Sequence, residues 1–158
     1  MCGTVATSRI NHVSISAPDL DASTRFYEEL FGARRLPAPN FGDPVRWFAI
    51  GDVQLHLFRS DDPPPANQHF AIAVDDFEAV YERARELGAF HDDGRRRHHL
   101  FELPGDALQL YLRDPAGNRV EVNALGASEV SPEIRRDVQR LADLQEQSAE
   151  NLEARLFL

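Results

Sequence analysis

The regular pattern of the chain begins with a short stretch in which apolar and polar residues alternate. In residues 10–17, Val13 and Ile15 fall on one side of an extended chain, and His12 shares the other side with two serines. A period of two is typical of a half-buried β-strand. The next segment, residues 20–31, repeats its apolar residues at helical spacing and is followed by a glycine. We therefore predict a strand and then a helix that ends at this glycine.

The same pattern recurs 57 residues further along the chain. His12 corresponds to His69, and Asp19, which can cap the first helix, corresponds to Asp76. An internal repeat at a fixed offset indicates a duplicated structural unit, and two copies are too few for a solenoid. We infer two pseudo-symmetric modules, each of which opens with a histidine on a short strand.

Three further β-rich runs follow the helix in each module. Gly51-Asp52 joins two of the runs as a compact hairpin. Residues 61–67 separate the modules, because the prolines there lack an amide donor and have a fixed φ. The order in each module is strand, helix, strand, strand, strand: residues 10–17, 20–31, 34–44 (strand and loop), 45–50 and 53–58, then 69–74, 76–87, 100–103, 107–112 and 119–124.

This order predicts an α+β fold of two pseudo-symmetric βαβββ modules plus a C-terminal helix. We place one domain at residues 8–125, with modules at about 8–60 and 67–125, and a helical extension at 126–158. Ser131 and Pro132 are typical of a helix N-terminus. A narrow apolar stripe then predicts a helix packed on the domain or on a second subunit: Ile134, Val138, Leu141, Leu144, Leu152 and Leu156.

Composition narrows the class of protein. The net charge of −9 argues against nucleic acid as a partner, because binding to phosphates needs a basic surface. The single cysteine, Cys2, excludes an intramolecular disulfide and fits a reducing cytoplasm. The sequence has no secretory signal pattern and no apolar run long enough to cross a bilayer. We expect a cytoplasmic protein without a membrane partner.

Four polar side chains occupy symmetry-related positions in the two modules. His56 corresponds to Glu121 when the last strands are aligned, as His12 corresponds to His69. Apolar residues flank each of them, so these side chains point away from the helices. If the modules lie edge to edge, three imidazoles and one carboxylate point into one concavity. This donor set favours a divalent transition metal (Fe, Ni, Co, Mn or Zn) over magnesium or calcium.

Other polar residues share these strand faces and are candidates for orienting the ligands or the substrate: Ser14, Ser16, Gln54, Gln109, Tyr111, Arg113 and Asn123. A metal with open positions can polarise a substrate that binds through oxygen atoms. Residues 91–99 are polar and basic and are predicted as a loop, so His91, His98 and His99 are expected at the surface. Arg95-Arg96-Arg97 is expected to be a solvated charge run, and as an alternative one of these arginines is a candidate clamp for an anionic substrate.

The turn Asp114-Pro115-Ala116-Gly117-Asn118, which leads into the strand that carries Glu121, is the most specific of several motifs shared with a known family. The other matching pieces are Asn11-His12-Val13, Pro18-Asp19-Leu20, Phe26-Tyr27, Leu30-Phe31-Gly32, residues 53–58 and residues 68–72. Over roughly residues 8–125 the chain resembles the vicinal-oxygen-chelate superfamily. That superfamily includes glyoxalase I, fosfomycin-resistance proteins, extradiol dioxygenases, methylmalonyl-CoA epimerase and bleomycin-resistance proteins.

The resemblance implies that the two modules form a metal-binding cup. By it, His12, His69 and Glu121 fall on family ligand positions, whereas His56 falls where glyoxalase-like members carry glutamate and some relatives carry glutamine. Two interpretations stay open. The metal has four ligands (His12, His56, His69 and Glu121), or it has three and His56 acts on the substrate.

The donor set and the resemblance together predict a metal-dependent enzyme whose small-molecule substrate chelates the metal through adjacent oxygens. Lyase or isomerase chemistry is expected first, with Glu121 or His56 moving a proton. An Fe(II) extradiol-type dioxygenase is one alternative, and a fosfomycin- or bleomycin-type resistance or ligand-sequestering protein is another. A homodimer is expected, and the sequence leaves open whether the cup forms within one chain or across a swapped dimer.

Overall fold

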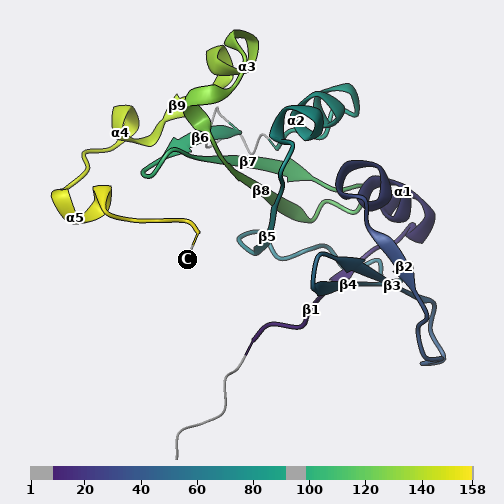
Figure 1. Ribbon diagram of the computed structural model, residues 1–158. Helices are drawn as coiled ribbons and strands as arrows, with labels where there is room; N and C mark the ends of the chain where they lie inside the picture. Colours follow the sequence, from purple (N-terminus) through teal and green to yellow (C-terminus); the bar gives the residue numbers. More distant parts are fainter. Residues whose placement is uncertain (1–8, 92–98, 158) are drawn as a thin grey trace, which may run out of the picture. The chain divides into compact units, whose positions relative to one another are not determined.

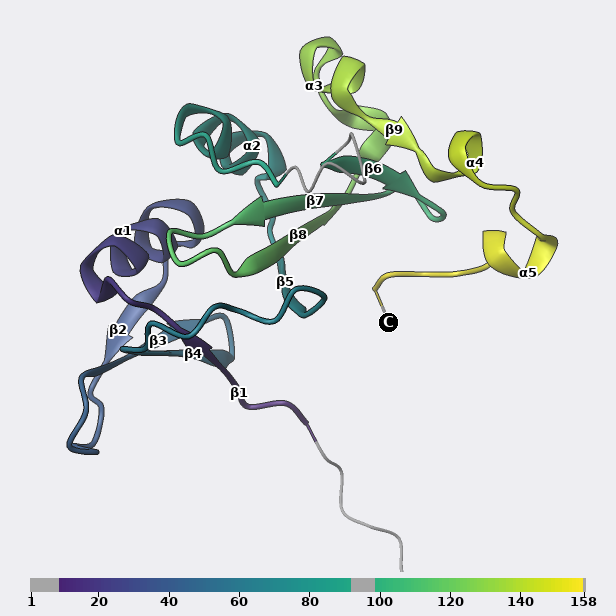
Figure 2. The ribbon, with the colours of Figure 1, turned by 180° about the vertical axis from the view of Figure 1, so that it is seen from behind.

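The structure is a computed structural model of the chain, and it describes residues 9–91 and 99–157 (Figure 1, Figure 2). The chain divides into two compact units, Met1–Pro64 and Pro65–Leu158, inside the proline-rich segment. Each unit contains one copy of the same order of elements and is described by itself. Cys2, His98 and the Arg95-Arg96-Arg97 run lie outside the described residues.

The first unit consists of one four-stranded sheet and one helix. Its strands are in the order β1-β4-β3-β2, with β1 parallel to β4 and the other two pairs antiparallel. The elements are β1 (His12–Ser16), α1 (Leu20–Phe31), β2 (Arg34–Leu36), β3 (Val45–Ile50) and β4 (Val53–Phe58). The boundaries of α1, β3 and β4 are those that the sequence predicts.

Helix α1 covers one face of this sheet. The carboxylate of Asp19 caps the helix, and the helix ends at Gly32, whose φ of 59° is left-handed. Arg46 of β3 reaches the helix and donates hydrogen bonds to the carbonyl of Leu20 (2.9 Å) and the hydroxyl of Thr24 (2.8 Å). The buried core between helix and sheet is formed by Phe26, Tyr27, Leu30, Phe48, Leu55 and Leu57. Because burial of these apolar side chains is favourable, the face that carries them packs on α1, and the opposite face of the sheet is left uncovered by the helix.

The second unit repeats this arrangement and adds a strand. Its strand order is β5-β8-β7-β6-β9, in which the first four strands reproduce the order of the first unit. The elements are β5 (His69–Ala73), α2 (Phe77–Glu86), β6 (Leu100–Leu103), β7 (Ala107–Arg113), β8 (Arg119–Leu125) and β9 (Gln139–Arg140). Helix α2 lies along one face of β7 and β8 (Figure 1, Figure 2). The predicted α+β fold of two βαβββ modules is confirmed.

The C-terminal extension is not the single helix that its apolar stripe predicts. It contains η1 (Ala127–Glu129), α3 (Pro132–Asp137), β9, α4 (Leu141–Leu144) and α5 (Ala149–Leu152). Helix α3 starts where predicted, but Val138 is extended and the chain then joins the edge of β6 as β9. In the described part of the chain, every helix is too short or too polar to span a membrane.

The apolar residues of the predicted C-terminal helix are not equally buried, which explains why they do not form one helix. Ile134 is only 1% exposed, whereas Leu152 is 51% exposed, so the predicted apolar positions do not share one buried face. Pairing with β6 satisfies backbone groups at the edge of a sheet. That pairing is a contact with a distant part of the chain, and helical periodicity does not reveal it.

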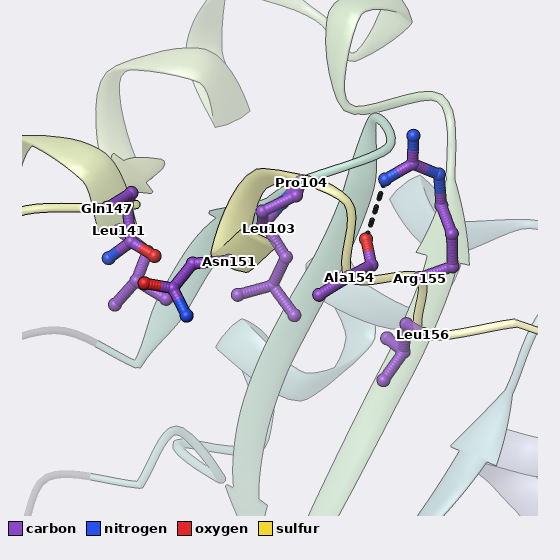
Figure 3. A pocket seen from close by; sticks show the side chains of 8 residues that line it. All are labelled: Leu103, Pro104, Leu141, Gln147, Asn151, Ala154, Arg155 and Leu156. Atoms are coloured by element: carbon purple, nitrogen blue, oxygen red, sulfur yellow. Dashed lines mark hydrogen bonds between the residues drawn. The ribbon is translucent and has the colours of Figure 1, made fainter. Parts of the chain in front are cut away.

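A pocket of about 290 Å³ lies in the second unit between the end of β6 and the C-terminal extension (Figure 3). Its lining is largely aliphatic and includes Leu103, Leu141 and Leu156. The guanidinium of Arg155 at this pocket donates a hydrogen bond to the carbonyl of Ala154 (2.8 Å). None of the residues predicted to hold a metal lines this pocket.

Candidate metal centre

In the first unit, His12 and His56 lie together on the sheet face opposite α1. Strands β1 and β4 pair so that His12 is level with Gln54 and Ser14 is level with His56. The two imidazole rings are stacked, with centroids 4.5 Å apart and planes inclined by 16°. The structure therefore brings these two predicted ligands together and confirms that Ser14 and Gln54 share their face. We call His12 and His56 the first-unit pair.

Contacts hold both rings of the first-unit pair. The indole of Trp47 stacks on the other side of His56 at 4.1 Å, and His56 Nε2 lies 2.9 Å from Oε1 of Gln54. Burial, and then the charge of His12, lower the pKa of the His56 imidazole below its ordinary value. Nδ1 of His12 lies 2.7 Å from Oδ1 of Asn11. A hydrogen bond from Nδ1 leaves the Nε2 lone pair for a ligand.

In the second unit, His69 and Glu121 lie together on the sheet face opposite α2, and we call them the second-unit pair. His69 is level with Arg119, and Glu121 is level with Ala71. His69 Nε2 lies 3.1 Å from Oε2 of Glu121, and Glu121 is only 3% exposed. Asn123 donates a hydrogen bond to the other carboxylate oxygen, Oε1, over 3.0 Å. A buried carboxylate needs such partners, because its transfer from water is unfavourable.

The Asp-Pro-x-Gly-Asn turn fixes where β8 begins. Asp114 accepts hydrogen bonds from the backbone amide and the side-chain amide of Asn118, each over 2.8 Å. Arg113 closes the same turn, since its guanidinium donates to the carbonyl of Gly117 over 2.9 Å. Because the turn is fixed on both sides, the register of β8 is fixed too, and with it the position of Glu121.

The two pairs occupy equivalent positions in the two sheets. In each unit, the histidine on the first strand is level with a residue two positions before the second candidate ligand. That residue is Gln54, before His56, in the first unit and Arg119, before Glu121, in the second. The duplication inferred from the sequence therefore extends to individual side chains.

The other predicted polar residues of the second unit share the face of the second-unit pair. Gln109 is level with Asn123, and Tyr111 is level with Glu121. The ring of Tyr111 meets the ring of His69 edge to face, with centroids 5.8 Å apart. Arg113 lies on the same face at its exposed end. Strand parity thus places all four of the predicted substrate-orienting residues in β7 and β8 beside the second-unit pair.

Two residues that the sequence analysis did not single out lie on the same sheet faces as these pairs. Trp47 is level with His56 across the β3–β4 hairpin, and the two-residue turn Gly51-Asp52 fixes that pairing. Arg119 shares the face of Glu121, and its guanidinium lies 5.9 Å from the centroid of Tyr111. Hairpin pairing and strand alternation, both visible in the sequence, are the signals that could have found them.

The expectation that His91 and His99 are exposed is wrong. His91 is 6% exposed, and its amide donates to the carbonyl of Tyr111 over 2.9 Å. His99 is half-buried and stacks on Phe90 with ring centroids 4.1 Å apart, and its carbonyl accepts from the amide of Tyr111 over 2.8 Å. The ends of the predicted loop bond to β7, and this contact with the sheet buries them.

The duplicated βαβββ fold defines a class of protein, and sequence comparison identifies it. The model of the Glyoxalase/Bleomycin resistance protein/Dioxygenase superfamily matches residues 9–122. This chain therefore belongs to that superfamily, and the resemblance seen in its motifs is confirmed.

Named relatives of similar identity carry different activities in their names. Metallothiol transferase FosB from Lysinibacillus sphaericus (strain C3-41) is 30% identical over 119 residues, which cover 71% of this chain and 79% of that protein. The crystal structure of lactoylglutathione lyase from Agrobacterium tumefaciens is 29% identical with a TM-score of 0.55, over 76% of this chain and 96% of that one. The structure of oxidase ChaP-H2 is 29% identical with a TM-score of 0.60, over 75% and 94%.

Proposed function

We propose that this chain is a divalent-metal-dependent enzyme in which His12, His69 and Glu121 bind the metal and His56 moves a proton of the substrate. The observation that carries the proposal is the separation of 3.1 Å between His69 Nε2 and Glu121 Oε2. Nitrogen and oxygen ligands of such a metal each lie at about 2.1 Å, so neighbouring ligands are about 3 Å apart. His12 occupies in the first unit the position that His69 occupies in the second, and it is the third ligand that we propose.

The proposed ligand set takes residues from both modules. Among the described residues as a whole, the structure contains no group of three or more histidine, cysteine, aspartate or glutamate side chains that could hold a metal. A catalytic metal of this type has about three protein ligands. We propose His69, Glu121 and His12 as these three. The donor set of imidazole nitrogens and one carboxylate suits a transition metal rather than magnesium or calcium.

The ring stack of the first-unit pair favours three ligands over four. A metal bound to an imidazole lies near the plane of the ring, on the lone pair of the nitrogen. The rings of His12 and His56 lie one above the other, with planes inclined by only 16°. Two such rings do not direct their lone pairs at one point. We therefore assign His12 to the metal and His56, whose Nε2 is beside Gln54, to the substrate.

The chemistry follows from these assignments. A divalent metal at this site would polarise two adjacent substrate oxygens and lower the energy of an enolate or oxyanion. His56 accepts a proton at an imidazole nitrogen and returns it, while the Trp47 stack holds the ring in place. The likeness to lactoylglutathione lyase supports lyase or isomerase chemistry. The likeness to metallothiol transferase FosB supports the alternative of a resistance-type protein that transfers a thiol.

Oxygen-dependent chemistry is the second candidate. Two histidines and one carboxylate are the ligand set of many non-haem Fe(II) oxygenases. The likeness to oxidase ChaP-H2 favours this candidate. Oxygen consumption by the Fe(II)-loaded protein with a catechol, compared with the Ni(II)-, Co(II)-, Mn(II)- and Zn(II)-loaded forms, separates it from lyase or isomerase activity.

The proposal is tested by metal analysis of three variants. Glu121→Gln should lose bound metal, whereas His56→Gln should keep the metal and lose exchange of a substrate carbon-bound proton with solvent deuterium. Methylglyoxal with a thiol provides the first substrate for this exchange. Glu146→Gln, which removes an exposed carboxylate outside the candidate site, is the matched control. The proposal is wrong if Glu121→Gln binds metal like the wild type, and the role of His56 is wrong if its variant loses metal.

A further inference from the structure

The ligand face of the second sheet differs in charge from the protein as a whole. The chain carries 26 acidic residues and 17 basic residues. In contrast, among the described residues of β5 to β9, this face has one carboxylate, Glu121, and two guanidinium groups, Arg113 and Arg119. A metal that binds Glu121 would offset the one carboxylate that the described strand residues place on this face. The face would then attract anions.

The two arginines of this face have different surroundings. Arg113 is exposed and is used by the turn, where it donates to the carbonyl of Gly117. Arg119 is half-buried, and its guanidinium lies 5.9 Å from the ring centroid of Tyr111. Its backbone is level with that of His69. A guanidinium packed on an aromatic ring loses less side-chain entropy when it binds a ligand.

Arg119 is also placed next to the ligand pair. It precedes Glu121 by two residues on β8, so both side chains project from the same sheet face. The Tyr111 ring that faces Arg119 also meets the ring of His69. A substrate that reaches the metal ligands therefore passes close to a fixed cation.

We infer that Arg119 binds an anionic oxyacid group of the substrate, of the carboxylate, phosphonate or phosphate type. The planar guanidinium presents paired N–H donors that match two oxygens of such a group. This inference rests on the proposed function, since it places the anionic group beside the oxygens that chelate the metal. It narrows the substrate to a small molecule with adjacent oxygens and a negative charge.

The test compares a charged probe with an uncharged one. Methylphosphonate and its neutral dimethyl ester are titrated by calorimetry into the full-length protein, both metal-free and Zn(II)-loaded. Arg119→Gln should weaken methylphosphonate binding by about 10- to 100-fold, the range for a lost charge-assisted hydrogen bond. Its binding of the ester should equal that of the wild type. Arg136→Gln, which removes an exposed arginine of α3, is the charge-matched control and should bind both probes like the wild type.

A second variant and a spectroscopic readout protect the test from a folding defect. Arg119→Lys keeps the charge but not the paired donors, and it should bind methylphosphonate with an intermediate affinity. In the wild type, the Arg119 Nε–H signal should shift on addition of methylphosphonate and not on addition of the ester. Equal methylphosphonate affinity in wild type and Arg119→Gln, with no shift of this signal, would overturn the inference. Metal analysis of the same protein tests the proposed metal site separately. The titrations of the metal-free protein test Arg119 without the metal, so failure of the inference can be distinguished from failure of the metal site.

Discussion

Asn123 donates a hydrogen bond to Oε1 of Glu121 over 3.0 Å, and the two residues lie two positions apart on the same face of β8. This bond fixes the carboxylate so that Oε2 faces His69. Mutation of a residue that orients a metal ligand in this way typically lowers metal affinity by about 10- to 100-fold. We propose Asn123 as a positioning residue for the proposed ligand Glu121, in addition to its place on the predicted substrate face.

Asn123→Ala should reduce metal affinity by about 10- to 100-fold while the protein still folds. The carboxylate of Glu121 would lose its orienting donor and sample other rotamers. Competition against a fluorescent chelator measures the change. Asn67→Ala, an exposed amide outside the sheets, is the matched control and should leave the affinity unchanged. An Asn123→Ala affinity equal to that of the wild type would remove the positioning role.

The stack of Trp47 on His56 makes the single tryptophan of the chain a reporter of that histidine. A protonated imidazole quenches indole fluorescence, so emission of the metal-free protein should fall as the pH is lowered. Burial, and then the charge of His12, lower the pKa of His56, so the midpoint should lie below the ordinary value of 6.5. His56→Gln should abolish the transition. A midpoint above 6.5 would contradict the direction of the shift.

The sequence predicts most of the fold because its signals are local. Asp19 and the following glycine bound α1, and alternation sets which face of each strand carries the histidines. The hydrogen bonds that orient the ligands depend on rotamers, which periodicity does not encode; Asn123 was therefore predicted on the right face but without its link to Glu121. The extension and His91 were mispredicted because both bond to strands distant in sequence.

Tyr81 ties helix α2 to the extension, because its buried hydroxyl donates a hydrogen bond to Asp137. Burial, and then this bond, hold the pKa of Tyr81 well above its ordinary value of 10.0. Above pH 10 the unfolded chain releases this proton and the folded protein keeps it, so the free energy of unfolding should fall as the pH rises. Tyr81→Phe should lack this part of the alkaline loss.

At pH 7 Tyr81→Phe should lower the free energy of unfolding by about 1.5 kcal/mol, because it removes a hydrogen bond to a charged group. The loss is at the lower end of the range for such bonds, because water can replace the Tyr81 hydroxyl as donor to the half-exposed Asp137. Glu133→Gln offers a contrast on the same helix. It breaks the pair between Arg85 and Glu133, whose side chains are 47% and 64% exposed, and the attraction in such an exposed pair is largely screened by solvent. Urea unfolding at several pH values measures both variants. An equal loss for the two would contradict the buried-bond explanation.

Two truncations test what the extension does for the second unit. A chain that ends at Arg140 keeps β9 on the edge of β6 and keeps Ile134, which is 1% exposed, in its buried place. It should unfold at a urea concentration close to that of the wild type, because no residue of α4 or α5 is buried.

A chain that ends at Leu125 loses Ile134, whose burial contributes about 1.5–3 kcal/mol, together with the Tyr81 bond to Asp137. It also leaves the edge of β6 without its parallel partner, and an open edge promotes association between chains. We expect a loss of several kcal/mol, about the sum of these contributions, and aggregation on gel filtration. If the chain ending at Leu125 were as stable and monodisperse as the chain ending at Arg140, residues 126–140 would have no structural role in the unit. The comparison therefore isolates these 15 residues from the terminal segment that follows them.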